Sequence, residues 1–445
     1  MALRVCHRLL ADSLALSRRF VAKLEHEPRI LSAGNSVCCR TSLVFSPVCF
    51  ISSETLLNRL SKSKVHQDED TASHLPTFVP PDNSEQFSLL MRTPNEPDNS
   101  KLLKVAIIGS PNAGKSTLSN QLLGKKVFAV SKKVHTTRSR AVGVLTEDET
   151  QIVLLDTPGL TSPSKVKRHN LEKSLLLDPW STVREADLIV AMVDVADKWM
   201  SSRLDFELLK CLTQNQSIPA ILVLNKVDLV KAKNRLLDIT AELTCGFVNG
   251  KKLHVRSVIK PPWAQKNPER KPQRVLPEDE SGCEMPGMLE SGLSQEQLSV
   301  LKDQRGWPHF KDVFMLSSVD QEDVQTLKSY FLLAAKPGPW LYHSDVLTDQ
   351  SPEEMCHNIV REKLLEYLPQ EVPYSMTQVM DYWRENETGQ LDICIKLHAK
   401  KDNHIRMVIG AGGQMVAQIA RETSEDLSRI FLREVRLKLS VKLVK

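Results

Sequence analysis

Short apolar runs alternate with amphipathic segments between residues 101 and 337 of this 445-residue chain. Six runs stand out: LLKVAIIG, AVGVL, QIVLLD, DLIVAMVD, AILVLNKVD and VFMLSS. Runs that are apolar at nearly every position are typical of strands buried on both faces. The pattern therefore predicts an α/β domain over 101–337, in which a mostly parallel sheet is covered by helices on both faces.

A second pattern follows the segment KPGPW at 336–340. Over 352–445 a helix (PEEMCHNIVREKLLEYLP) is followed by two strands, a helix that enters a glycine-rich bend, a longer helix and a closing strand (EVRLKLSVKLV). No period of 20 to 50 residues recurs, which argues against a repeat architecture. We therefore expect a separate α+β domain over 352–445.

Two stretches interrupt these patterns. Residues 44–100 are polar and punctuated by proline, which predicts a disordered linker. Residues 245–306 contain the basic run KKLHVRSVIKPPWAQKNPERKPQR and then the acidic EDESGCE, which predicts a long loop inserted in the first domain. The insertion is either a solvated excursion or a folded unit, and its basic half could touch RNA.

The first 43 residues carry seven Arg or Lys against three acidic residues, with leucine and valine at helical spacing. They lack the continuous apolar segment of a secretory signal, so we interpret 1–43 as a mitochondrial transit peptide that directs the protein to the matrix; the alternative is a disordered basic tail. No run approaches the ~18 apolar residues that a membrane-spanning helix needs. The nine cysteines show no CxxC spacing and indicate neither a zinc site nor a disulfide framework.

A glycine-rich loop, GSPNAGKS at 109–116, follows the first predicted strand and opens a helix. In this context backbone N–H groups converge on phosphates at a helix N-terminus, the lysine neutralises the β and γ oxygens, and the serine hydroxyl ligates Mg²⁺. The loop thus predicts a phosphate site. The residues assigned to it are Gly109, Ser110, Pro111, Asn112, Ala113, Gly114, Lys115, Ser116 and Thr117.

Two further motifs at strand ends identify the nucleotide. In Asp156-Thr157-Pro158-Gly159 the carboxylate can hold Mg²⁺ through water, and the glycine amide can sense the γ-phosphate. In NKVD at 225–228, Asp228 can accept the guanine N1–H and N2–H groups, which adenine lacks. Asn225 would brace the loop and contact the base, and Lys226 is assigned to the same GTP site. Ser317 and Ser318 would contact the guanine ring through their backbone. The motifs predict a GTPase, since the alternative, a P-loop ATPase or kinase, gives no reason for NKVD.

These motifs, together with HTTRSRAVGVL and LNKVDLV, resemble the Era family of translation-associated GTPases. The resemblance implies a P-loop GTPase domain, and it implies that switch I provides Thr137 to Mg²⁺, with Thr136 as the adjacent candidate. The implied metal ligands are Ser116 and Thr137. The implied catalytic residues are Lys115, Thr137, Asp156 and Gly159, with GTP and Mg²⁺ as cofactors and slow intrinsic hydrolysis.

Leu160 stands after DTPG where Ras-like enzymes place a water-orienting glutamine. A hydrophobic side chain cannot orient water. The family resembles GTPases in which K⁺, held partly by an asparagine of the phosphate loop, supplies the missing positive charge, and Asn112 matches that position. The alternative is that Asn112 only caps the loop.

A second glycine-rich bend, GAGG at 410–413, lies between two predicted helices. The bend and the element order fit a type II KH domain, whose GxxG loop clamps the backbone of about four nucleotides. Nearby cations are candidates for phosphate contacts. The RNA-binding residues assigned are Lys400, Lys401, Arg406, Ile409, Gly410, Ala411, Gly412, Gly413 and Arg421. The alternative is that GAGG is only a tight turn between two helices and that the nearby charges form a solvated face.

The sequence and the resemblance together predict a GTP-hydrolysing protein that binds mitochondrial small-subunit ribosomal RNA and assists assembly of the small ribosomal subunit. One alternative is a nucleotide-dependent protein-interaction switch, peripheral to the inner membrane, that docks a protein or a lipid headgroup. Another is a tRNA-modifying GTPase. That class would need a modification domain or a catalytic cysteine, and Cys356 and Cys394 lie inside helix and strand patterns.

Overall fold

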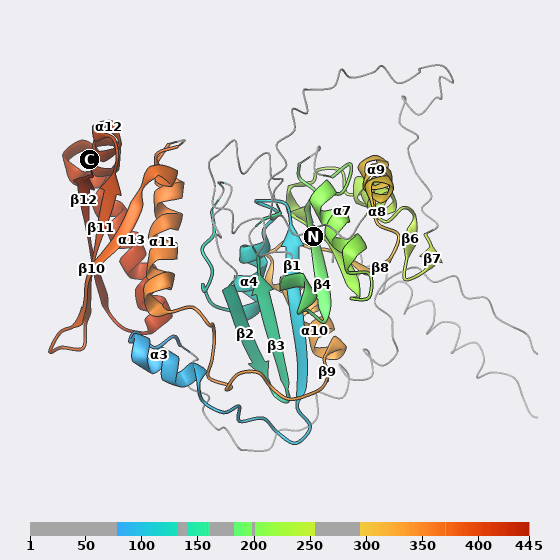
Figure 1. The fold of residues 1–445 in the computed structure, drawn as a ribbon, viewed down its shortest axis with the longest axis horizontal. Coiled ribbons are helices and arrows are strands. Elements are labelled where there is room, and N and C mark those ends of the chain that lie inside the picture. The colour runs from blue at the N-terminus through green and yellow to red at the C-terminus, as the bar shows by residue number, and fades with distance from the viewer. Residues whose placement is uncertain are drawn as a thin grey trace, which may run out of the picture. The chain divides into compact units, whose positions relative to one another are not determined.

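The computed structural model describes residues 78–131, 133, 141–157, 159–160, 182–197, 201–253, 294–369 and 371–444. They belong to one compact unit that begins at Thr77 (Figure 1). The predicted transit peptide over 1–43, Thr136, Thr137 and Pro158 lie outside the described residues. Every helix among the residues described is too short or too polar to cross a membrane.

The larger sheet contains the six predicted strands in the order β2-β3-β1-β4-β5-β8, with β9 paired to β1. β2 is antiparallel to β3 and β9 is antiparallel to β1, whereas all other neighbours are parallel. This confirms the mostly parallel sheet. The strands are β1 (Lys101–Gly109), β2 (Ala141–Glu147), β3 (Thr150–Asp156), β4 (Leu188–Asp194), β5 (Ala220–Asn225), β8 (Phe310–Met315) and β9 (Lys336–Pro337).

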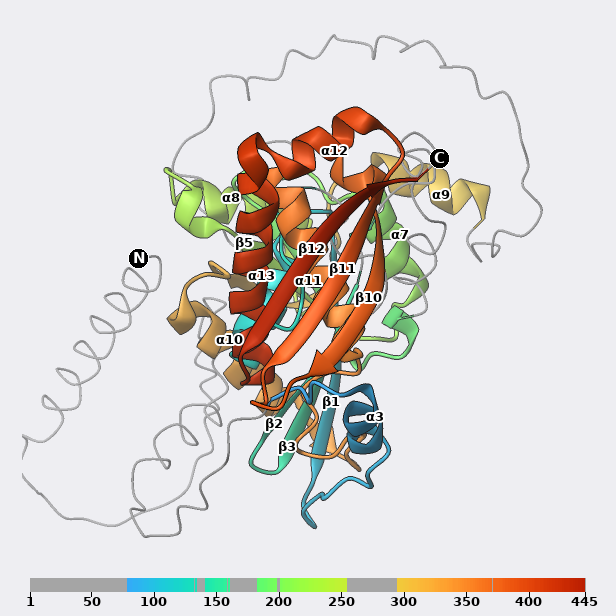
Figure 2. The same ribbon diagram turned by 90° about the vertical axis from the view of Figure 1, so that its left-hand side faces the viewer.

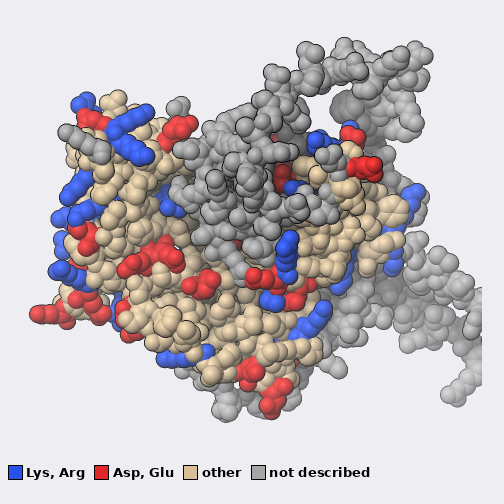
Figure 3. Space-filling view, in the orientation of Figure 1, with Lys and Arg blue, Asp and Glu red and all other residues tan. Residues whose placement is uncertain are grey.

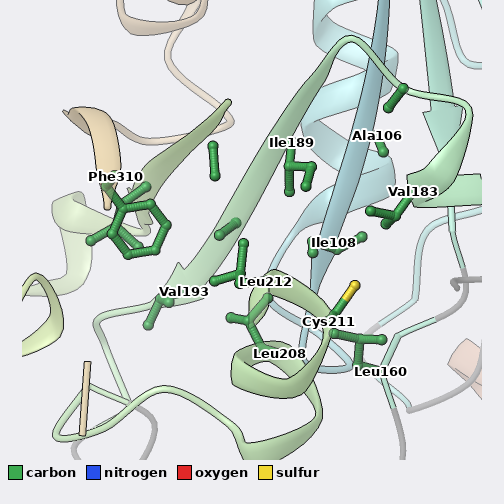
Figure 4. Close-up of a cluster of buried hydrophobic side chains, with 14 of the residues drawn as sticks. Ala106, Ile108, Leu160, Val183, Ile189, Val193, Leu208, Cys211, Leu212 and Phe310 are labelled. Carbon is green, nitrogen blue, oxygen red and sulfur yellow. The ribbon is translucent and has the colours of Figure 1, made fainter. Parts of the chain in front are cut away.

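Helices cover both faces of this sheet, which explains why its strands are apolar at nearly every position. On one face Ala106 and Ile108 of β1 join a buried cluster with Leu208 and Leu212 of α7 (Figure 4). Helices α4 and α10 are absent from that cluster and instead contact strands β1 and β3. The helices are α4 (Lys115–Leu123), α7 (Phe206–Gln214), α8 (Arg235–Leu243), α9 (Gln295–Asp303) and α10 (Gln321–Ala334).

The second sheet has the order β10-β11-β12, with β10 antiparallel and β12 parallel to β11. Helices α11 and α13 lie on one face of this sheet (Figure 2). The observed order of elements is the one predicted over 352–445, and it is consistent with a type II KH domain. The elements are α11 (Pro352–Tyr367), η3 (Pro373–Ser375), β10 (Thr377–Glu385), β11 (Leu391–Ala399), α12 (Asp402–Ile409), η4 (Ala411–Gly413), α13 (Gln414–Phe431) and β12 (Val435–Leu443).

Helix α3 (Asn83–Leu90) lies in the stretch for which the sequence predicts a linker. The Asp82 side chain caps its N-terminus, and buried Gln86 donates through Nε2 to the carbonyls of Thr348 (2.8 Å) and Gln350 (3.3 Å). The Trp383 indole N–H also donates to the Pro81 carbonyl at 3.0 Å. Besides these polar bonds, Leu89 is the one apolar residue of the helix that is buried, so apolar periodicity gives little signal for it. The prediction of a disordered linker is wrong for this helix.

Both ends of the predicted insertion are folded. Strands β6 (Phe247–Val248) and β7 (Lys251–Lys252) form a hairpin, and Ser294 begins α9 with a capping box. Leu301 and Trp307 are buried in the core of the larger sheet. The prediction of a loop over all of 245–306 is therefore wrong at these two ends, and residues 254–293 lie outside the described residues.

Candidate nucleotide site and candidate nucleic-acid groove

The glycine-rich loop joins the carboxyl end of β1 to the start of α4, so the helix N-terminus faces the site. Lys115 is buried there, and its Nζ donates to the carbonyls of Gly109 (3.2 Å) and Ser110 (3.0 Å). Burial lowers the pKa of Lys115 to about 8, and Asp156 partly opposes this shift. A phosphate bound in the loop would stabilise the ammonium form further.

Ser116 and Asp156 meet at the edge of the loop. The Ser116 hydroxyl donates to Asp156 Oδ2 at 2.8 Å, and Asp156 is fully buried at the end of β3. Next to it the Thr157 hydroxyl donates to the Ile107 carbonyl at 2.8 Å, which fixes the backbone that follows β3. A hydroxyl and a carboxylate beside phosphates fit Mg²⁺, which would neutralise charge on the β and γ oxygens.

Two glycines allow the loops around the site to approach one another. Gly114 has φ +100°, and a Cβ there would stand 2.2 Å from Asn225 Nδ2. A Cβ on Gly159 would stand 2.8 Å from the backbone of Pro111. Leu160 follows, donates its N–H to the Gly109 carbonyl at 3.0 Å and buries its side chain in the core. The leucine side chain is therefore packed away from solvent.

Asn225 links three segments that are distant in the sequence. Its Nδ2 donates to the Ala113 carbonyl at 2.7 Å, and its Oδ1 accepts from both the backbone N–H and the hydroxyl of Ser318 at 2.9 Å. The N–H of neighbouring Ser317 donates to Asp323 Oδ2 at 2.8 Å. The phosphate loop, NKVD and the serine pair thus form one site.

Lys226 contacts the phosphate loop, and Asp228 is exposed. Its Nζ donates to the Asn112 carbonyl at 2.8 Å and pairs with Asp194 Oδ2 at 2.6 Å. Asp228 lies in η1 (Val227–Leu229), directly after β5, with an exposed side chain. Asp194 and Asp323 are site residues that were not predicted from the sequence. The signal for Asp194 is its position as the polar end of the run DLIVAMVD.

An open groove of about 730 Å³ lies between α13 and β12. Of the predicted RNA-binding residues only Arg421 lines it, and two further cations, Arg436 and Lys438, also line it. The missed signal is the alternation of cations in VRLKLSVKL. The remaining lining residues are Gln390, Val416, Ala417, Ala420, Ser424, Glu434, Val435, Leu437 and Leu439.

The GAGG bend lies at the start of α13. Gly412 (φ +60°) and Gly413 (φ +82°) are left-handed, and a Cβ on either would meet nothing within 4 Å. At Gly410 a Cβ would stand 2.7 Å from Met415 Cβ, so packing requires that glycine. Ala411 is exposed in the bend. A ligand can therefore approach the middle of the bend closely.

The other predicted RNA contacts surround α12. Lys400 and Lys401 are exposed at its N-terminus, and Ile409 is 37% exposed at its end. Arg406 is also exposed, and its Nη2 lies 3.3 Å from Asp402 Oδ2. An exposed pair of this kind contributes little to stability, so Arg406 can exchange its partner for a phosphate at small cost.

Comparison with known proteins identifies the family. The profile of the family described as "50S ribosome-binding GTPase" matches residues 104–226. The chain is 65% identical over 407 residues to "GTPase Era, mitochondrial" of Salmo salar, covering 89% of this chain and 88% of that protein. The protein of the same name from Danio rerio is 55% identical over 458 residues, covering 100% of both chains. This chain belongs to the Era family of GTPases.

Comparison with solved structures agrees with this family assignment. A crystal structure of Era in complex with MgGDPNP and nucleotides 1506–1542 of 16S ribosomal RNA matches with a TM-score of 0.56 and 26% identity, covering 78% of this chain and 94% of that one. The predicted P-loop GTPase fold is thereby confirmed. As an Era-family member the chain is a GTP-hydrolysing enzyme.

Proposed function

We propose that this Era-family GTPase acts in the mitochondrial matrix, binds mitochondrial small-subunit ribosomal RNA and assists small-subunit assembly. The observation that carries the proposal is the cationic groove beside the exposed GAGG bend, in a chain whose structural neighbour Era is seen with 16S ribosomal RNA. The names of the two fish relatives and the Arg-rich segment 1–43 support the mitochondrial location.

The proposed roles at the nucleotide are those predicted from the sequence, and the contacts of the described residues support them. Lys115 binds the β and γ phosphates, and the Gly159 amide senses the γ-phosphate. Ser116 and Thr137 ligate Mg²⁺, and Asp156 contacts it through water. On the other side of the site, Asp228 accepts from guanine, Asn225 holds the loop, and Ser317 and Ser318 close on the ring.

At the GAGG bend, the proposed ligand is RNA backbone. The bend admits a phosphate chain because Gly412 and Gly413 leave open space. Small side chains, Ala417 and Ala420, line the adjacent groove and leave room for bases, while Arg421 supplies charge.

Contacts near switch I support control of RNA engagement by the nucleotide. Lys126 Nζ lies 2.7 Å from both Glu362 Oε1 of α11 and Asp426 Oδ2 of α13, and the Val130 N–H donates to Glu362 Oε2 at 2.8 Å. This segment leads from α4 toward Thr137, and α13 begins at the GAGG bend. A change around Thr137 would therefore act on two helices of the RNA-binding unit.

The test is filter binding to small-subunit ribosomal RNA over a salt series. Contact with about four phosphates should give a slope of log affinity against log salt of about −3. The same assay in GDP and in a non-hydrolysable GTP analogue should give unequal affinities. A protein-docking or lipid-docking unit, the alternative, would bind this RNA weakly and without preference over other RNA.

We also propose that K⁺ takes part in hydrolysis. Asn112 has φ +63° in the phosphate loop, and Leu160 is buried where a glutamine would orient water. Hydrolysis should be several-fold faster in potassium than in sodium, and Asn112→Ala should remove the difference. GTP affinity of the variant is the control for loop distortion. Equal wild-type rates in both salts would show that the extra charge comes from elsewhere, such as a partner's arginine.

A further inference from the structure

The face of the β10–β12 sheet opposite α11 and α13 is rich in cations. Residues paired across neighbouring strands point to the same side, so the register defines this open face. Its four rows are Arg384-Asp392-Arg436, Tyr382-Cys394-Lys438, Val379-Lys396-Ser440 and Thr377-His398-Lys442, with Asp381 at a bulge in β10. Five Lys or Arg stand against two Asp, a net charge of 5 − 2 = +3 with His398 neutral.

Side-chain contacts agree with this assignment of the face. Lys396 pairs with Asp381 across the strands, and Lys442 acts on the same carboxylate. Cys394 is buried beneath these side chains: burial and Asp381 raise the pKa of its thiol, whereas Lys438 and Lys396 lower it. Lys396, Lys438 and Lys442 thus lie near Asp381 or Cys394, and Arg384 and Arg436 lie in the next row of the same face.

An aromatic ring lies among these charges. The Arg384 guanidinium carbon is 5.6 Å from the centroid of the Tyr382 ring, and Tyr382 is half-buried on the open face. Cations interleaved with an aromatic ring are suited to phosphate chains with bases that can stack. An acidic protein surface would pair with the cations but has no bases to stack on the Tyr382 ring.

No described helix lies over this face (Figure 2). In Figure 3 this face is seen side-on at the left-hand edge, which carries several Lys and Arg, with Asp and Glu between them and at the lower end. Arg436 and Lys438 also line the groove between α13 and β12. Because β12 is the edge strand, the groove and the open face form one continuous cationic surface across it.

We propose that the open face of β10–β12 is a second RNA contact, which holds the phosphate backbone of RNA that continues past the groove over β12. The inference rests on the proposed function and extends it: the groove binds a short single strand, and the open face adds affinity for a longer RNA. Positive charge spread over a sheet contributes through counterion release and carries no sequence preference of its own.

The test compares two RNAs and two charge-matched variants. The open-face variant, Arg384→Gln/Lys396→Gln/Lys442→Gln, changes cations that do not line the groove. The control variant, Lys231→Gln/Lys302→Gln/Lys311→Gln, removes the same charge from exposed lysines outside the second sheet. The RNAs are a strand of about six nucleotides, enough for a loop that clamps about four, and a longer small-subunit ribosomal RNA fragment containing it. Circular dichroism and GTP hydrolysis report folding.

The open-face variant should bind the longer RNA at least tenfold more weakly, with a salt slope shallower by about 2, because three contacts are lost. Its affinity for the short strand should stay within about twofold of wild type, and the control should match wild type on both RNAs. Unchanged affinity for the longer RNA, or equal losses of affinity for both RNAs, would overturn the inference. Wild-type protein that binds neither RNA would instead contradict the proposed function itself.

Discussion

Replacing Gly412 by aspartate should lower RNA affinity about a hundredfold while GTP hydrolysis stays near the wild-type rate. Gly412 has φ +60° and open space around it, so the added carboxylate would stand where RNA backbone approaches. A carboxylate 4 Å from a phosphate is repelled by about 1 kcal/mol in water and about 4 kcal/mol near a protein surface, which brackets a hundredfold loss. Filter binding and phosphate release on one preparation measure both quantities.

Gly250→Asp is the matched control. Gly250 also has a left-handed φ, +70°, with nothing within 4 Å of a Cβ, and it lies in the β6–β7 turn outside the second sheet. Both substitutions add the same charge and the same backbone strain of about 1–2 kcal/mol. Folded Gly412→Asp protein that retained wild-type RNA affinity would mean that GAGG is only a turn between helices.

Asp228→Asn should lower GTP affinity by about two orders of magnitude or more and raise the use of xanthosine triphosphate. The carboxylate can accept from guanine N1–H and N2–H, whereas an amide presents a donor where the guanine amino group needs an acceptor. Xanthine carries an oxygen at that position. Competition binding between the two nucleotides measures the change.

Asp238→Asn, at an exposed position in α8, controls for loss of a surface charge. Asp228 is itself exposed, so its substitution should leave folding intact. An unchanged preference for GTP in the Asp228 variant would mean that groups other than Asp228 recognise guanine.

The sheet and the nucleotide site could be predicted from the sequence because their local residue patterns directly reflect their positions in the fold. A strand buried on both faces is apolar throughout, and a motif directly after such a strand lies at the edge where parallel strands end. Asn225, directly after the interior of β5, is an example of a residue whose place in the site could be predicted in this way. Its partners, the Ala113 carbonyl and the Ser318 backbone, lie 112 and 93 residues away and required the fold.

The features that could not be predicted from the sequence depend on polar groups that are far apart along the chain. Gln86 holds α3 through two carbonyls that lie over 260 residues later, and no helical periodicity encodes such bonds. Arg436 and Lys438 reach the groove because β12 pairs in parallel with β11 beside α13. The Lys126 contacts require α11 and α13 to lie next to each other. In each case the relevant residue is polar, and only the fold shows where its side chain lies.

We propose above that this GTPase binds small-subunit ribosomal RNA in mitochondria. Ultraviolet crosslinking in intact mitochondria, followed by sequencing of the bound fragments, tests it most directly. Wild-type protein and Gly250→Asp should enrich fragments of the mitochondrial small-subunit ribosomal RNA, and Gly412→Asp should lose them. Fragments distributed as in total mitochondrial RNA, with no difference among the three proteins, would contradict the account.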